Sequence, residues 1–122
     1  MKTAVTILQF AVRILALVLV VLGIMFWTGR SFKLVPVHMR LGEILIALLW
    51  LLAGMGLRAG VKAGLTFGAI VYGLLAFLFA INMGGFLAGG AHEIIRVLHL
   101  LIGLGAVGLA ESIAARVKRS AA

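Results

Sequence analysis

The sequence predicts an all-α integral membrane protein, folded as an antiparallel up-down bundle of four transmembrane helices. Of its 122 residues, 65% are hydrophobic and only three are acidic. A soluble domain of this length has too much surface for its volume to hide so many apolar side chains. Four apolar runs, residues 4–28, 37–57, 61–83 and 94–115, are each long enough for a hydrocarbon core of about 30 Å. The connections between them are short, so residues 1–122 are expected to form a single transmembrane domain.

The first two runs are joined by a short polar connection. The first run ends at FWTGR, where Trp27 suits the headgroup region of a membrane. Arg13 interrupts this run and no small-residue cleavage site follows it, so we interpret it as an uncleaved helix rather than a signal peptide. SFKLV then predicts a segment along the membrane surface. Pro36 falls where the second run begins, and proline at a first helical position loses no hydrogen bond.

Glycines mark the ends and packing faces of the later runs. GMGLRAG ends the second run. In the third run, Gly64 and Gly68 form a pair of small residues one turn apart, which predicts close packing against a neighbouring helix. A glycine-rich loop at residues 83–93 leads to the fourth run. That run carries small residues that also predict tight packing: Gly103, Gly105, Gly108, Ala110 and Ala114.

Basic side chains lie mainly at the ends of the runs. The net charge is +8, but no basic segment is interleaved with exposed aromatic residues, so we expect anionic lipid headgroups rather than nucleic acid as the partner. With four spans, one side holds Lys2, Arg13, Arg58, Lys62, Arg116, Lys118 and Arg119, and the other holds Arg30, Lys33, Arg40 and Arg96. This bias predicts a bacterial inner-membrane protein with both termini cytoplasmic. The chain has no cysteine, which excludes disulfides, iron–sulfur clusters and thiolate metal sites.

Ionisable residues within or beside the predicted spans are candidates for function, because a bilayer makes them costly. They are Arg13, His38, Arg40, Glu43, His92, Glu93, Arg96, His99 and Glu111. Two of the histidines share a pattern, since each precedes a glycine by four residues. At about 1.5 Å per residue, His38 lies roughly 30 Å from Arg58 and His99 roughly 26 Å from Arg116, so their depths nearly match.

The paired His-xxx-Gly spacing predicts a haem site. Gly42 and Gly103 each lie one turn from a histidine and leave a flat gap beside the imidazole, which a porphyrin needs. His38 and His99 would be the two axial ligands, and two imidazoles give low-spin iron suited to electron transfer. The basic residues near this level are candidates to pair with the haem propionates: Arg96, Arg30, Lys33 and Arg40.

In these features the chain resembles the four-helix b-type membrane cytochromes, of the cytochrome b561-like kind. The resemblance rests on four spans and on His38, Gly42, His99 and Gly103. It implies one haem b held by the two histidines, with electrons exchanged with a quinone or a redox partner protein. Members of that family often carry four histidines for two haems, whereas this chain has three, so the resemblance supports one haem.

A different class of function fits the same sequence. A non-catalytic accessory or assembly subunit would use its Gly and Ala faces to bind a larger membrane complex or further copies of itself. Arg40 with Glu43, and Glu93 with Arg96, would then be i,i+3 pairs at the membrane surface. Glu111 would reach the headgroups near the basic C-terminal segment.

Two further alternatives have less support. A zinc site has suitable ligand types in His38, His92, His99 and Glu93, but their spacings match no known zinc motif. A channel or exporter needs a polar path through the midplane of the membrane. The third run offers few polar residues for such a path: Thr66, Tyr72 and Asn82.

Overall fold

The computed structural model describes residues 1–86 and 89–120, and in these ranges it contains helices and no strand. The four long helices are α1 (Lys2–Trp27), α2 (Val35–Arg58), α3 (Ala63–Asn82) and α4 (His92–Ser120). Each is long and apolar enough to cross a membrane. The all-α class and the four candidate spans predicted from the sequence are therefore confirmed.

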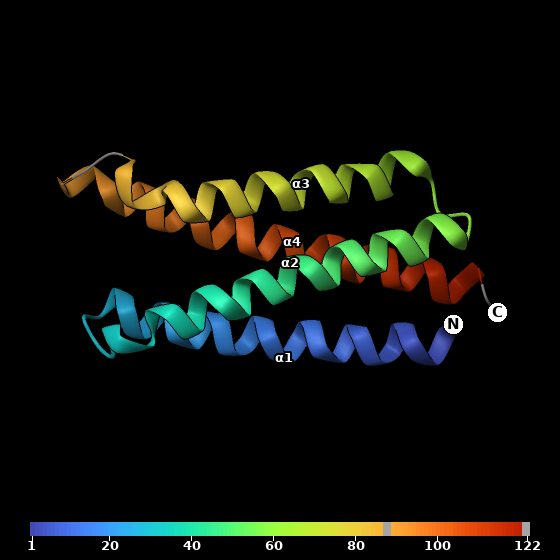
Figure 1. Ribbon diagram of the computed structural model, residues 1–122, viewed down its shortest axis with the longest axis horizontal. Helices are drawn as coiled ribbons and strands as arrows, with labels where there is room; N and C mark the ends of the chain where they lie inside the picture. Colours follow the sequence, from blue (N-terminus) through green and yellow to red (C-terminus); the bar gives the residue numbers. More distant parts are fainter. Residues whose placement is uncertain (87–88, 121–122) are drawn as a thin grey trace.

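The helices form an elongated bundle in which neighbours in the sequence run in opposite directions (Figure 1). Helices α2 and α4 run the same way, and both termini lie at one end of the bundle. Helices α2 and α4 contact each other, and each also contacts α1 and α3. Residues at equal heights on α2 and α4 can therefore meet inside the bundle.

The helix ends follow local sequence signals. Pro36 lies in the first turn of α2, as predicted, and a 3₁₀ turn at Phe32–Leu34 precedes it. The chain leaves α1 through Gly29, whose φ of 81° favours glycine. Helix α4 continues to Ser120, beyond the predicted end at residue 115, because charged residues end a membrane span without ending a helix. The predicted loop at residues 83–93 contains two 3₁₀ turns, and its residues 87 and 88 lie outside the described residues.

The core is built from branched and small side chains of all four helices. Its largest fully buried members are Leu49, Leu52, Ile113, Val5, Val12, Val117 and Thr66. Small residues are also fully buried in the core, among them Ala53, Ala106, Ala110 and Ala114. Many large apolar side chains instead point outward, including Leu17 at 66% exposure and Ile7 at 63%. An apolar exterior around an interior that includes many small residues is the arrangement that lipid favours.

Three glycines are positions where the helices approach too closely for a side chain. A Cβ on Gly56 would lie 2.9 Å from a methyl carbon of Thr66, and a Cβ on Gly73 would lie 2.5 Å from the Trp50 indole nitrogen. A Cβ on Gly105 would collide with the Tyr72 hydroxyl. These glycines set the spacing between neighbouring helices.

The predicted packing through Gly64 and Gly68 is wrong within this bundle. A Cβ on either residue would meet nothing within 4 Å, and both residues are exposed. The reason is the rotation of α3, which turns Thr66, Ala69 and Gly73 toward the other helices instead. A small-xxx-small pair indicates where close approach is allowed, but it does not say which face of the helix is used.

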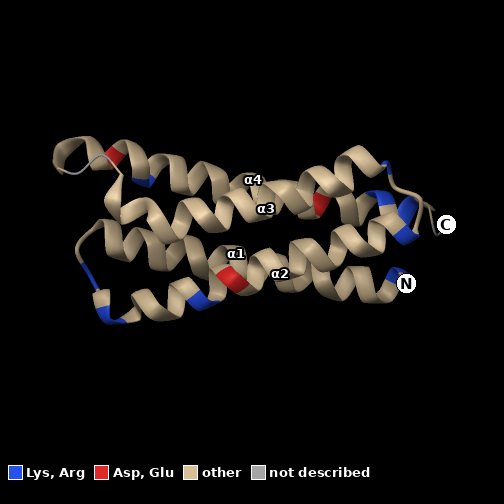
Figure 2. Ribbon diagram, turned by 45° about the horizontal axis from the view of Figure 1, so that its top comes forward, with Lys and Arg blue, Asp and Glu red and all other residues tan. Residues whose placement is uncertain are grey.

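Basic residues gather near the two ends of the bundle (Figure 2). The end with the termini carries Lys2, Arg58, Lys62, Arg116, Lys118 and Arg119. The acidic residues lie on α2 and α4: Glu93 is in the first turn of α4, and Glu43 and Glu111 lie farther into their helices. This distribution matches a helical bundle whose ends face headgroups and whose sides face hydrocarbon.

Candidate functional site

The centre of the candidate site is a pair of imidazoles on α2 and α4. The ring centroids of His38 and His99 are 6.1 Å apart, and the ring planes are inclined at 56°. The matched depth expected for these residues is thus confirmed. It arises because α2 and α4 run in the same direction and contact each other.

Phenylalanines from the other two helices flank this pair. Phe26 of α1 meets His38 edge to face, with 5.4 Å between ring centroids, and Phe79 of α3 stacks on His99 at 6.5 Å. Each helix therefore contributes one ring to a row across the bundle, which we call the aromatic row: Phe26, His38, His99 and Phe79. Sequence reasoning missed the two phenylalanines, because nothing distinguishes them from other apolar residues in their runs.

The imidazoles have little hydrogen bonding of their own. Nδ1 of His38 is buried without a partner, the one such side-chain atom among the described residues. Leaving a buried polar group unpaired costs about 1–3 kcal/mol. A hydrocarbon environment supplies no water to relieve that cost. His38 is therefore suited to binding a group that satisfies its imidazole nitrogen.

The spacing of the rings suits one metal ion held between them. A metal–imidazole nitrogen bond is about 2 Å, and each nitrogen lies roughly 1 Å from its ring centre, so the centres across one ion are about 6 Å apart. The observed separation is 6.1 Å. Open space also lies one helical turn from each histidine, since a Cβ on Gly42 or Gly103 would meet nothing within 4 Å. The ring separation and the open space at the two glycines are features that a planar group held by two imidazoles would require.

Two of the four basic residues predicted near this level, Arg96 and Arg40, are paired with carboxylates. A nitrogen of Arg96 donates to Glu93 at 2.6 Å, and Arg40 donates to Glu43 at 3.0 Å. Both are the i,i+3 pairs that the sequence suggested. Glu93 also accepts a hydrogen bond of 2.8 Å from the indole nitrogen of Trp27, so it joins the end of α1 to the start of α4.

His92 lies apart from the imidazole pair. It begins α4, and its Nδ1 is 3.0 Å from the carbonyl oxygen of Phe86. Throughout residues 1–86 and 89–120, no three His, Cys, Asp or Glu side chains come together as metal ligands. The alternative of a zinc site from the three histidines with Glu93 is therefore wrong, because His92 is held at the loop.

A second polar cluster links α1 and α4 closer to the end with the termini. Arg13 forms an ion pair of 2.7 Å with Glu111, which also accepts a hydrogen bond from Gln9. Lys118 in turn donates to the Gln9 side chain at 2.6 Å. Glu111 is thus paired across helices rather than turned to the headgroups, as the sequence had suggested. Gln9 was not identified from the sequence, because a single uncharged polar residue in an apolar run is not a specific signal of function.

Two shallow hollows lie elsewhere, along α2. One of about 360 Å³ is lined by Trp50, Leu51, Gly54, Met55 and Arg58. The other, of about 400 Å³, is lined by Glu43, Ile46, Ala47, Trp50 and Phe77. Neither is lined by a histidine, so both are separate from the aromatic row.

Comparisons of the chain with protein-family models, curated proteins and solved structures give no match. Its function must therefore be argued from its own residues. Three features of the structure bear on the function. They are the imidazole pair, the open space at Gly42 and Gly103, and the ion pairs between and along the helices.

Proposed function

We propose that this chain is a multi-pass protein of the bacterial inner membrane that binds one haem b between His38 and His99 and transfers electrons. The observation that carries the proposal is the 6.1 Å separation of the two imidazole rings. It is supported by the buried, unpartnered Nδ1 of His38 and by the open space at the two glycines. The weak resemblance to b-type membrane cytochromes points to the same cofactor.

The membrane location rests on the exterior of the bundle. Its outward side chains are mostly apolar, and its basic residues lie near its ends. More of them lie at the end with the termini, which favours a cytoplasmic location for both termini. Anionic lipid headgroups are the expected partners of these basic ends.

Each part of the site has a separate role in this proposal. A haem would supply one-electron redox chemistry, and two imidazole ligands favour electron transfer over oxygen binding. His38 and His99 would hold the iron, while Gly42 and Gly103 would leave room for the ring. Phe26 and Phe79 pack against the imidazoles from outside and keep water away from them.

Basic residues near the site would meet the propionates. Arg96 and Arg40 are each bound by a carboxylate, so they would share their donors between that carboxylate and a propionate. Electrons would be exchanged with a quinone or a redox partner protein.

The test is the absorbance spectrum of protein purified in detergent after expression with ample haem. The parent chain should be red, with low-spin bands that sharpen on reduction. His38→Ala or His99→Ala should remove one axial bond and abolish that spectrum or make it high-spin. His92→Ala is the matched control and should keep the parent spectrum, because His92 lies at the loop. A folded but colourless parent would end the proposal.

A second variant tests the space beside the ligand. Gly103→Leu should lower haem occupancy, because its side chain would enter the gap meant for the ring. Gly108→Leu is the control on the same helix. A Cβ at either position meets nothing within 4 Å, so both variants should fold. Equal haem content in the two variants would contradict the assigned position of the ring.

A non-catalytic accessory subunit is the alternative, and one observation favours it. The small residues Gly64 and Gly68 are exposed and have no partner helix inside the bundle. Such a face allows another transmembrane helix to approach closely. If the protein is colourless, a partner that co-purifies from native membranes and is lost in Gly68→Leu would support this reading.

A further inference from the structure

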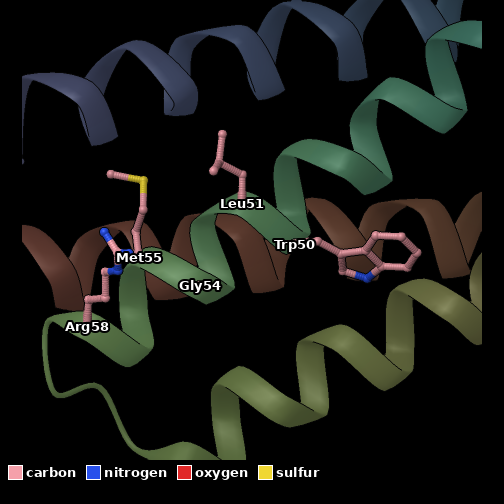
Figure 3. A pocket seen from close by; sticks show the side chains of 5 residues that line it. All are labelled: Trp50, Leu51, Gly54, Met55 and Arg58. Carbon is pink, nitrogen blue, oxygen red and sulfur yellow. The ribbon is translucent and has the colours of Figure 1, made fainter.

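The outward face of α2 has a hollow centred on Gly54 (Figure 3). Its shape follows from the sequence, because Gly54 has no side chain, while Trp50, Leu51 and Arg58, three or four positions away, form the rim together with the adjacent Met55. Leu51, Met55 and Arg58 lie on one side, and the Trp50 indole lies farther along the helix with its nitrogen toward α3. A Cβ on Gly54 would meet nothing within 4 Å. The hollow is thus open to whatever surrounds the bundle.

Trp50 gives this hollow a fixed apolar wall. Its indole nitrogen donates to the carbonyl oxygen of Ile70 at 3.1 Å. The indole can reach this position only because residue 73 is glycine, since a Cβ on Gly73 would lie 2.5 Å from the indole nitrogen. The ring is therefore held between α2 and α3 instead of turning freely in the surrounding medium.

The hollow ends at a basic residue. Arg58 is exposed and takes part in none of the three ion pairs of the described residues, which engage Arg13, Arg40 and Arg96. Lys62 lies in the same turn between α2 and α3. Any occupant with an anionic group would meet positive charge here with no competing carboxylate from the ion pairs.

The length of the hollow matches one leaflet. Trp50 and Arg58 are eight residues apart. This is about 12 Å along a helix. Half of a hydrocarbon core of about 30 Å is about 15 Å. An acyl chain whose headgroup lies at Arg58 would therefore reach Trp50 within its own leaflet.

We infer that this hollow binds an anionic phospholipid of the leaflet nearest the termini. The phosphate would lie at Arg58, and an acyl chain would cover Gly54 and end against Trp50. Charge complementarity at Arg58 selects an anionic headgroup, and the apolar wall selects a hydrocarbon chain. The inference rests on the membrane location of the bundle but not on haem binding, and its test needs no haem signal.

The test uses Trp50 as a fluorescent reporter. The chain has two tryptophans, so Trp27→Phe, at the opposite end of the bundle, leaves Trp50 alone. The protein is reconstituted in vesicles with a small fraction of phosphatidylglycerol or phosphatidylcholine brominated on the acyl chains, which quench a tryptophan they touch. The anionic lipid should quench Trp50 at roughly one fifth of the concentration that the zwitterionic lipid needs, the preference expected from one basic residue.

Two substitutions with matched controls distinguish binding of the lipid headgroup from binding of the acyl chain. Arg58→Gln should abolish the preference for phosphatidylglycerol, whereas Arg119→Gln, at the same end of the bundle, should keep it. Gly54→Leu should weaken quenching by both lipids because it fills the hollow. Gly64→Leu, on an exposed face of α3 at the same end, should not.

Three results would overturn the inference. The first is equal quenching of the parent by the two lipids, and the second is a preference that survives Arg58→Gln. The third is weak quenching by both lipids in a parent protein that is dimeric and becomes monomeric in Gly54→Leu. That outcome would show that a second copy covers the hollow. A colourless protein would leave these measurements intact, so failure here is distinguishable from failure of the haem proposal.

Discussion

Gly105→Ala tests whether a close contact between α3 and α4 holds the bundle together. The Tyr72 hydroxyl donates to the carbonyl oxygen of Ile102 at 2.7 Å, and a Cβ on Gly105 would collide with that hydroxyl. The neighbouring ring carbon would be 3.0 Å from the new atom, so the whole side chain must shift. One methyl group should therefore displace the ring and break its hydrogen bond.

The size of the effect follows from three contributions. Alanine is favoured over glycine in a helix by about 1 kcal/mol. Against this, a hydrogen bond between membrane helices is worth about 0.6 kcal/mol. Overpacking a fitted interior costs about 1–3 kcal/mol. Gly105→Ala should thus lower the free energy of unfolding by about 0.6–2.6 kcal/mol. Gly108→Ala, on the same helix with open space around it, should be neutral or stabilising.

The assay is reversible unfolding in mixed lipid and SDS micelles, followed by far-UV circular dichroism. A double-mutant cycle with Tyr72→Phe identifies the mechanism, because phenylalanine lacks the oxygen that the new methyl meets first. In that background Gly105→Ala should cost less than in the parent. The reasoning is refuted if Gly105→Ala is as harmless as Gly108→Ala, or if its cost is unchanged by Tyr72→Phe.

Three further predictions concern the remaining contacts. Gly68→Leu should leave the unfolding midpoint unchanged, because its side chain points away from the bundle; a large loss would mean that α3 is rotated differently. Glu111→Gln should lower the unfolding midpoint and the yield of protein, because it leaves Arg13 without its carboxylate, and an unchanged midpoint would argue against the pair. Trp27→Phe should cost about 0.6 kcal/mol through loss of its hydrogen bond to Glu93, measured by the same unfolding assay.

The number and approximate ends of the helices could be predicted because hydrophobic run length is a strong signal in this chain. All four predicted runs overlap the helices of the structure, and Pro36 marks the start of α2. Rotation about the helix axis could not be predicted. Lipid-facing and interior residues are both apolar, so Gly64 and Gly73 look alike in sequence although only Gly73 is packed against a neighbour.

The candidate site was predictable in part for the same reason. His38 and His99 stand out in apolar runs, and counting residues from the basic ends places them at one level. Their 6.1 Å separation also requires contact between α2 and α4, which depends on packing rather than on counting. The role of Gln9, in contrast, could not be predicted from the sequence. Its role appears only when α4 places Glu111 and Lys118 beside it.

The polar side chains of the bundle fall into two groups, and the difference between them supports the proposed function. Glu93 and Glu111 lie on α4, and each is bound by a partner on α1, so their cost in a membrane is offset within the chain. His38 has no such partner for its buried nitrogen. A bilayer offers no water to replace one, and the proposed haem would remove this cost by binding the imidazole. His99 lies at the distance at which one metal ion would engage both rings.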